Sequence, residues 1–187
     1  AWLNTEVVLL AELVVDRYAD ALTAAATGDR WLAEEVVDGD DEINERYLEL
    51  ERHCTDLIAL QQPVASDLRL ITASFKIITD LERVGDLATN LAARTRAGQE
   101  GIHPAVDIET LGGDAAAMVE AAIEAYEAAD PEACRTVAER DDELDAACDR
   151  ATRRLIRSLL SEHAVDREAA RTAASRGLLT VRDIERV

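Results

Sequence analysis

The sequence predicts an all-α protein built as two tandem antiparallel three-helix bundles related by internal duplication. Three observations support this fold class. Apolar residues make up 48% of the 187 residues but aromatic residues only 3%, a composition typical of helices packed through small aliphatic side chains. Glycine and proline are few, at eight and three, which leaves long stretches uninterrupted. The acidic motifs of the first half also recur in the second half.

The first half divides into three helical segments that form the first bundle, over residues 1–97. Apolar residues recur in them at every third or fourth position, as on one face of a helix. Gly28 interrupts this pattern after the first segment, and Pro63 ends the second because proline cannot continue a helix. The expected helices cover residues 4–26, 31–60 and 66–94.

A linker over residues 97–106, which is rich in glycine and proline, separates the first bundle from a second over residues 107–187. The Asp130-Pro131 pair predicts a helix start, with aspartate as the N-cap and proline at the first helical position. The expected helices cover residues 108–129, 130–162 and 166–187.

The two halves align on their acidic residues. The alignment needs an offset of 101 residues before the turn between the last two helices of each bundle and 103 after it, so the turns differ by two residues. The matched positions are Asp40 with Asp141, Asn44 with Asp145, Asp80 with Asp183 and Glu82 with Glu185. This repetition indicates that one arrangement of acidic side chains was built twice.

Residues equally far from a turn lie at the same level of an antiparallel helix pair. If Pro63 is the centre of the first turn, Asn44 lies opposite Glu82 and Asp40 lies opposite Asp86. Each pair on one helix is four residues apart and therefore shares a helix face. The first bundle is thus expected to hold a ladder of four oxygen-bearing side chains.

The same construction in the second bundle uses Val165 as the centre of the turn. It places Asp145 opposite Glu185, while Asp141 would face a position two residues beyond Val187. A three-residue ladder is expected there. The candidate metal ligands of both ladders are Glu82, Asp86, Asp40, Asn44, Asp141, Asp145 and Glu185.

Ligand sets made of oxygen atoms suit hard divalent cations or iron, so the cofactor expected is a metal ion such as Fe, Mn, Mg or Zn. Two other interpretations stay open: the acids form ordinary solvated helix faces, or they pair with Arg83 and Arg186. A ferritin-like di-iron enzyme is disfavoured because the Glu-x-x-His pattern of Glu100 and His103 lies inside the linker. Metal-dependent hydrolysis would need a positioned water and a general base that the sequence does not supply.

Charge and composition limit the function classes further. The net charge is −19, and Lys76 is the only lysine against 19 arginines, so direct binding of nucleic acid or anionic lipid is disfavoured. An acidic surface poor in lysine resembles proteins from salt-loving organisms. No apolar run reaches the roughly 20 residues that span a bilayer. We expect a cytoplasmic protein with no membrane insertion and with three buried free thiols, at Cys54, Cys134 and Cys148.

Three segments resemble the PhoU family of phosphate-uptake regulators. Residues 61–69 (QQPVASDLR) are similar to its inter-helix signature, residues 81–90 (LERVGDLATN) to its acidic helix motif, and residues 178–187 (LLTVRDIERV) to a second copy of that motif. The Pro-x-x-x-Asp-Leu-Arg and Glu-Arg-x-Gly-Asp patterns are fairly specific, and the resemblance covers nearly the whole chain.

The resemblance implies two three-helix bundles with multinuclear metal sites on their surfaces. It also implies a non-enzymatic regulator that contacts a phosphate ABC transporter ATPase, a sensor kinase, or both. Carried over by motif, Glu82 and Asp86 are the first metal candidates. Two departures matter: Asn44 stands where a carboxylate is expected, and the Gly-Asp expected after Val187 is absent from this sequence. Exposed apolar stripes favour a homodimer. The alternative function is a structural scaffold whose acids serve halophilic solubility without a functional metal.

Overall fold

The computed structural model describes residues 2–98, 106–160 and 167–187, and every regular element in them is a helix. The all-α prediction is therefore confirmed. The expected linker falls largely on residues 99–105, outside the described residues. The expected end of one helix at residue 162 and the expected start of the next at residue 166 also lie outside them. The helices are α1 (Trp2–Thr27), α2 (Arg30–Asp38), α3 (Asp40–Gln61), α4 (Ala65–Arg96), α5 (Ile108–Glu127), α6 (Pro131–Leu160) and α7 (Arg167–Glu185).

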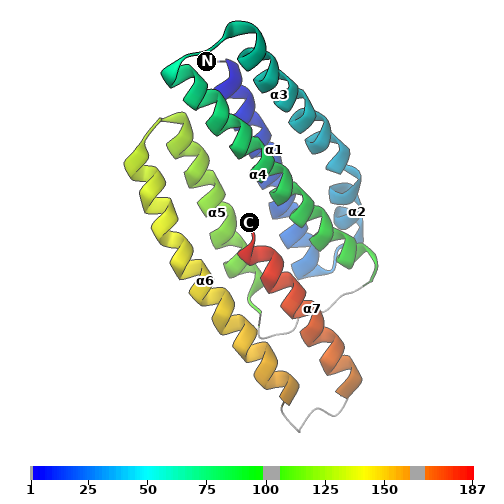
Figure 1. Cartoon of the computed structure of the whole chain (residues 1–187). Coiled ribbons are helices and arrows are strands. Elements are labelled where there is room, and N and C mark those ends of the chain that lie inside the picture. Colours follow the sequence, from blue (N-terminus) through cyan, green and yellow to red (C-terminus); the bar gives the residue numbers. More distant parts are fainter. Residues whose placement is uncertain (1, 99–105, 161–166) are drawn as a thin grey trace.

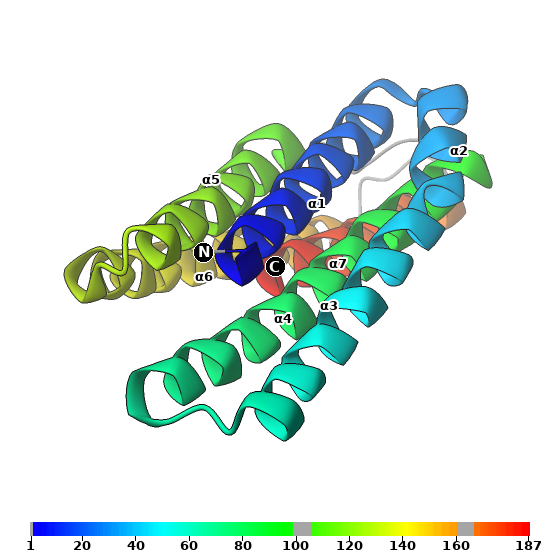
Figure 2. The same ribbon diagram turned by 90° about the horizontal axis from the view of Figure 1, so that it is seen from above.

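The helices form two antiparallel bundles that lie side by side (Figure 1). The first contains α1, α4 and the α2–α3 pair, and the second contains α5, α6 and α7. Helix α1 packs along α5, and α4 touches α7, so the two bundles are joined through their first and last helices. Seen from above, the α3–α4 and α5–α6 hairpins project from this joined centre (Figure 2).

The expected second helix is divided into α2 and α3 at Gly39, so the prediction of one helix over residues 31–60 was wrong. The backbone N–H of Gly39 closes α2 by donating to the Glu35 carbonyl oxygen. A Cβ atom at this position would lie 2.7 Å from the guanidinium carbon of Arg17, so a larger residue would displace the end of that side chain. The break matters because α3 then begins at Asp40, a candidate ligand.

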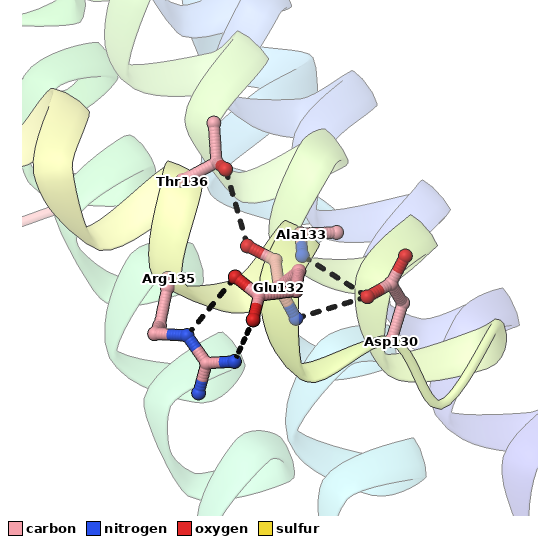
Figure 3. A network of polar contacts seen from close by, with 5 residues as sticks. All are labelled: Asp130, Glu132, Ala133, Arg135 and Thr136. Carbon is pink, nitrogen blue, oxygen red and sulfur yellow. Dashed lines mark hydrogen bonds and ion pairs between the residues drawn. The ribbon is translucent and has the colours of Figure 1, made fainter.

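The start of α6 follows the Asp-Pro signal. The Asp130 carboxylate accepts from the backbone N–H groups of Glu132 at 2.9 Å and Ala133 at 3.2 Å, which confirms the predicted cap (Figure 3). Glu132 also forms an ion pair with Arg135, and its carbonyl oxygen accepts from the Thr136 hydroxyl at 3.1 Å. These contacts leave the first turn of α6 without unsatisfied donors at its Asp130 end.

The hydrophobic core forms two clusters, and neither is confined to a single bundle. One cluster joins Tyr18 and Leu91 of the first bundle to Leu144, Leu155 and Ile184 of the second. A second cluster, centred on α1, α3 and α4, receives partly buried residues of α5 along the α1–α5 seam. Large buried apolar area between helices is the main stabilising contribution to such a fold, so each bundle depends on the other.

The α1–α5 seam is tightly packed at Gly112. A Cβ atom on Gly112 would lie 2.3 Å from a Leu22 methyl carbon, so only glycine allows this approach. Farther along, the Tyr126 hydroxyl of α5 donates to the Asn4 side-chain oxygen of α1 at 3.2 Å and lies 2.8 Å from the Ser74 hydroxyl of α4. Among the helices described, none offers an apolar stretch of membrane-spanning length.

Cysteine burial agrees with the sequence at two positions of three. Cys54 and Cys148 are buried free thiols, as predicted. Cys134 is an exposed free thiol, so its predicted burial was wrong. It lies among alanines near the start of α6, where the alanine-rich face turns toward solvent instead of the core.

Candidate metal centre

The first acidic ladder lies where the start of α3 meets the middle of α4. Asp40 is the first residue of α3, and Asn44 follows one turn later; the Asn44 amide donates to an Asp40 carboxylate oxygen at 3.0 Å. The other Asp40 oxygen accepts from the Thr89 hydroxyl of α4 at 2.8 Å. Asp40 therefore links the two helices close to Asp86, three residues before Thr89.

The two acids of α4 share an electrostatic environment with Asp40. Burial raises the pKa of the Glu82 carboxyl, Asp86 and Asp40 raise it further, and Arg83 lowers it. Burial also raises the pKa of the Asp86 carboxyl, and Asp40 adds to that effect. Like charges raise one another's pKa only when they lie close together, so the three carboxylates form one acidic cluster across α3 and α4.

The helices α3 and α4 approach each other closely beside this cluster. Gly85 lies between Glu82 and Asp86 on α4, and a Cβ atom there would lie 3.2 Å from two carbon atoms of Ile43. A glycine in mid-helix costs about 1 kcal/mol relative to alanine, and here it accommodates the Ile43 side chain of α3. Arg83 points to another partner, since it pairs with Asp80 at 3.0 Å.

The donor set suits a metal ion in its chemistry but not in its present geometry. Oxygen ligands from Asp40, Glu82 and Asp86 fit a hard cation in chemical type. As the side chains lie, however, no group of three or more histidine, cysteine, aspartate and glutamate residues in the described ranges is gathered closely enough to hold an ion. Both Asp40 oxygens already accept hydrogen bonds, so a cation would require Glu82 and the exposed Asp86 to turn toward it.

The second ladder is more open. Asp141, Asp145 and Glu185 are all exposed. Asp145 and Glu185 come together around Cys148: burial first, then these two carboxylates and Asp149, raise the pKa of the Cys148 thiol to about 11. Among the residues that the structure describes, no contact or electrostatic effect joins Asp141 to this group, which therefore contains two of the three expected members.

Sequence reasoning missed the charged pair that joins the bundles. Asp183 of α7 is buried and accepts from an Arg94 nitrogen of α4 at 2.6 Å. Its counterpart in the first repeat, Asp80, is exposed. The alignment of the repeats identified both aspartates as equivalent, but the sequence contains no signal that only one would be buried.

The same junction holds a buried tyrosine. The Tyr18 hydroxyl has no hydrogen-bond partner in the described part of the chain. Burial raises its pKa strongly, and Cys148 and Asp183 add to the rise. Tyr18 therefore stays protonated, and its ring contributes mainly apolar packing between α1 and the second bundle.

Known proteins resemble the chain along most of its length. An Aquifex aeolicus protein named phosphate-specific transport system accessory protein PhoU homolog is 35% identical over 84% of this chain and 72% of its own length. A Pseudomonas putida protein of the same name is 32% identical over 85% of this chain, which spans 63% of that relative. The crystal structure of PhoU from Pseudomonas aeruginosa superimposes with a TM-score of 0.90 at 29% identity, covering 98% of this chain and 87% of that one. Because the family described as PhoU domain also matches residues 7–95 and 108–187, the chain belongs to the PhoU family.

Proposed function

We propose that this chain is a metal-binding regulator of phosphate uptake and of phosphate-responsive signalling. It acts in the cytoplasm, as a homodimer, through contacts with the ATPase of a phosphate ABC transporter, with a sensor kinase, or with both. The names of the curated relatives, which are accessory proteins of a phosphate-specific transport system, support the transport part of this proposal.

Regulation rather than catalysis follows from the family. PhoU proteins are regulatory accessory proteins, and the prediction that the chain is not an enzyme is thereby confirmed. The two bundles therefore function through surfaces that other proteins contact, and the acidic ladders belong to such surfaces rather than to reaction centres.

The observation that carries the metal part is that Asp40 raises the pKa of both the Glu82 and the Asp86 carboxyl, and that Asp86 raises the pKa of Glu82 as well. Three carboxylates from two helices repel one another at neutral pH, and the nearby Arg83 is engaged with Asp80. These three residues, with the Asn44 amide oxygen, are the proposed ligands at the first ladder; Asp145 and Glu185, with Asp141, are those at the second. A bound cation supplies the positive charge that would neutralise this repulsion.

The alternative function is a helical scaffold whose acidic surface serves solubility at high salt, without a functional metal. Two observations favour it. The net charge is −19, which a high ionic strength would screen. The acids are also not gathered into a coordination cage within the described residues. Under this alternative the ladders would be solvated helix faces.

Equilibrium dialysis followed by elemental analysis separates the two functions. The wild-type chain is dialysed against iron, manganese, magnesium and zinc, and compared with a Glu82→Ala/Asp86→Ala variant. The matched control is Glu45→Ala/Glu49→Ala, which removes two exposed acids at the same four-residue spacing on α3. We expect the first variant alone to lose bound metal. Equally little metal on all three proteins would leave the scaffold function as the better account.

The partner contact is tested with purified proteins. The chain is mixed with the transporter ATPase or the sensor kinase from the same organism, with and without a chelator, and complex formation is followed by size-exclusion chromatography. A complex that forms with metal and weakens with chelator supports a metal-binding regulator. A complex insensitive to chelator favours the scaffold, and the absence of any complex with either partner contradicts the contacts proposed here.

A further inference from the structure

A groove of about 490 Å³ follows the seam between α1 and α5. Its floor is apolar: Val8 and Val15 of α1 and Ile123 of α5 are half-buried there, above the fully buried Ala11. The two helices run in opposite directions side by side, as both views show (Figures 1 and 2). The tight contact of Gly112 with Leu22 lies farther along the same seam, outside the lining of the groove.

The walls of the groove are acidic on both sides. Glu12 and Asp16 project from α1, and Glu120, Glu124 and Glu127 project from α5. Within each wall the acids are three or four residues apart, so they lie on one helix face with about 4.5–6 Å of rise from one acid to the next. All five are exposed, and the groove is lined by no arginine, lysine or histidine.

None of these five carboxylates forms an ion pair with another described residue. A minority of the acids elsewhere on the surface, such as Glu42 and Asp149, do pair with arginines. The chain thus presents an apolar strip between two rows of unpaired negative charge, whereas a merely solvated helix face would not require a concave apolar floor.

We infer that this groove docks a basic amphipathic helix of a partner protein. The apolar stripe of that helix would cover Val8, Val15 and Ile123, and its lysine or arginine side chains on either flank would reach the two acidic rows. This is helix-in-groove recognition with electrostatic steering. The inference rests on the proposed function in one respect, that the chain acts through protein contacts, and it names the surface and the chemistry of the partner.

Other occupants match the groove less well. Anionic lipid and nucleic acid are repelled by the carboxylates. A divalent cation alone would leave the apolar floor uncovered. A second copy of this chain carries the same net charge of −19 and complements five carboxylates poorly, so the proposed homodimer would form through another face.

The test uses a synthetic probe and two charge-matched variants. The probe is a fluorescent leucine–lysine peptide of about 14 residues with leucines at helical spacing, long enough to span about 21 Å. Its binding to the full chain is measured by fluorescence anisotropy at about 50 mM and about 300 mM salt, where the Debye length shortens by more than half. The groove variant is Glu12→Gln/Asp16→Asn/Glu120→Gln/Glu124→Gln. The control variant is Glu34→Gln/Glu45→Gln/Asp56→Asn/Glu139→Gln, four exposed acids outside the groove.

The groove variant should weaken binding at least about tenfold, and the control variant by less than about threefold, because both change the net charge equally. A peptide of the same composition with its leucines scattered around the helix should also bind at least about tenfold more weakly. Equal losses in the two variants would mean that binding follows net charge, and equal binding of the two peptides would mean that the floor contributes nothing. Either result overturns the inference, as does the absence of binding to the wild-type chain.

Two further measurements identify a different occupant or a failure elsewhere. If the groove variant instead loses bound Mn²⁺ in dialysis, or loses a dimer in sedimentation, the groove holds a cation or a second copy and the inference is wrong. Peptide binding by the Glu82→Ala/Asp86→Ala variant should equal that of the wild type. A failed peptide test with intact metal and partner binding therefore refutes this groove alone, and the reverse result refutes the proposed function alone.

Discussion

Two adjacent glycines of α5 give a sharp test of the inter-bundle packing. Gly112 is buried against Leu22, and a Cβ atom there would lie 2.3, 2.7 and 3.0 Å from three Leu22 carbon atoms. Gly113 is exposed, and a Cβ atom there would meet nothing within 4 Å. Alanine at either position improves helix propensity by about 1 kcal/mol. That gain cancels when the two variants are compared.

The difference between Gly112→Ala and Gly113→Ala therefore measures overpacking alone. Forcing an extra methyl into a packed core costs about 1–3 kcal/mol. Leu22 is not free to yield, because its Cγ atom as well as both methyl carbons stand in the way and its side chain belongs to the shared core. We expect Gly113→Ala to be as stable as the wild type or more so, and Gly112→Ala to be less stable than Gly113→Ala by that amount.

Urea unfolding followed by circular dichroism measures both free energies, and thermal unfolding should show midpoints about 2–12 °C apart. A Leu22→Ala change should cost less in the Gly112→Ala background than in the wild type, since the two side chains occupy the same space. If the two glycine variants differ by less than about 0.5 kcal/mol, Leu22 does not limit how closely α5 packs against α1.

Three other predictions concern the charged and thiol groups. Asp183→Ala should lower the unfolding free energy by about 3 kcal/mol because it leaves the partly buried Arg94 unpaired. Asp80→Ala, at the equivalent exposed position, should cost less than about 0.5 kcal/mol. Equal losses in urea unfolding would contradict an inter-bundle role for Asp183. The pKa values of Glu82 and Asp86 are raised in the folded chain, so their contribution to stability is fully present below the unfolded pKa of about 4 and is lost as pH rises through the folded pKa. In EDTA, the Glu82→Gln/Asp86→Asn variant should therefore be more stable than the wild type at pH 7, and the difference should shrink toward pH 4. A difference that does not depend on pH would refute the carboxylate cluster. Finally, one thiol of the native chain should react quickly with Ellman's reagent, because the other two thiols are buried with raised pKa values. Three thiols should react after denaturation, and Cys134→Ser should abolish the fast reaction of the native chain.

Local patterns in the sequence were sufficient for the fold class and for parts of the first ladder. Helical spacing of apolar residues located the helices, and the Asp130 cap located the start of α6. Counting outward from the Pro63 turn placed Asp40 near Asp86, where the structure has them within electrostatic reach. These inferences succeed because a helix has a fixed period and a hairpin fixes the level of its two arms. The break at Gly39 was missed because a single glycine inside a periodic stretch is often tolerated.

What lies opposite a helix face is a different matter, and only the tertiary structure decided it. Asp80 and Asp183 occupy equivalent places in the repeat, yet only Asp183 meets another bundle and becomes buried beside Arg94. Cys134 and Cys148 lie in similar alanine-rich surroundings, yet only Cys148 faces the shared core. The period of a helix sets which residues share a face, whereas burial and pairing depend on the packing of segments distant in sequence. The fold class was therefore determined by the sequence alone, while the inter-bundle ion pair and the α1–α5 groove exist because two similar bundles pack against each other through different faces.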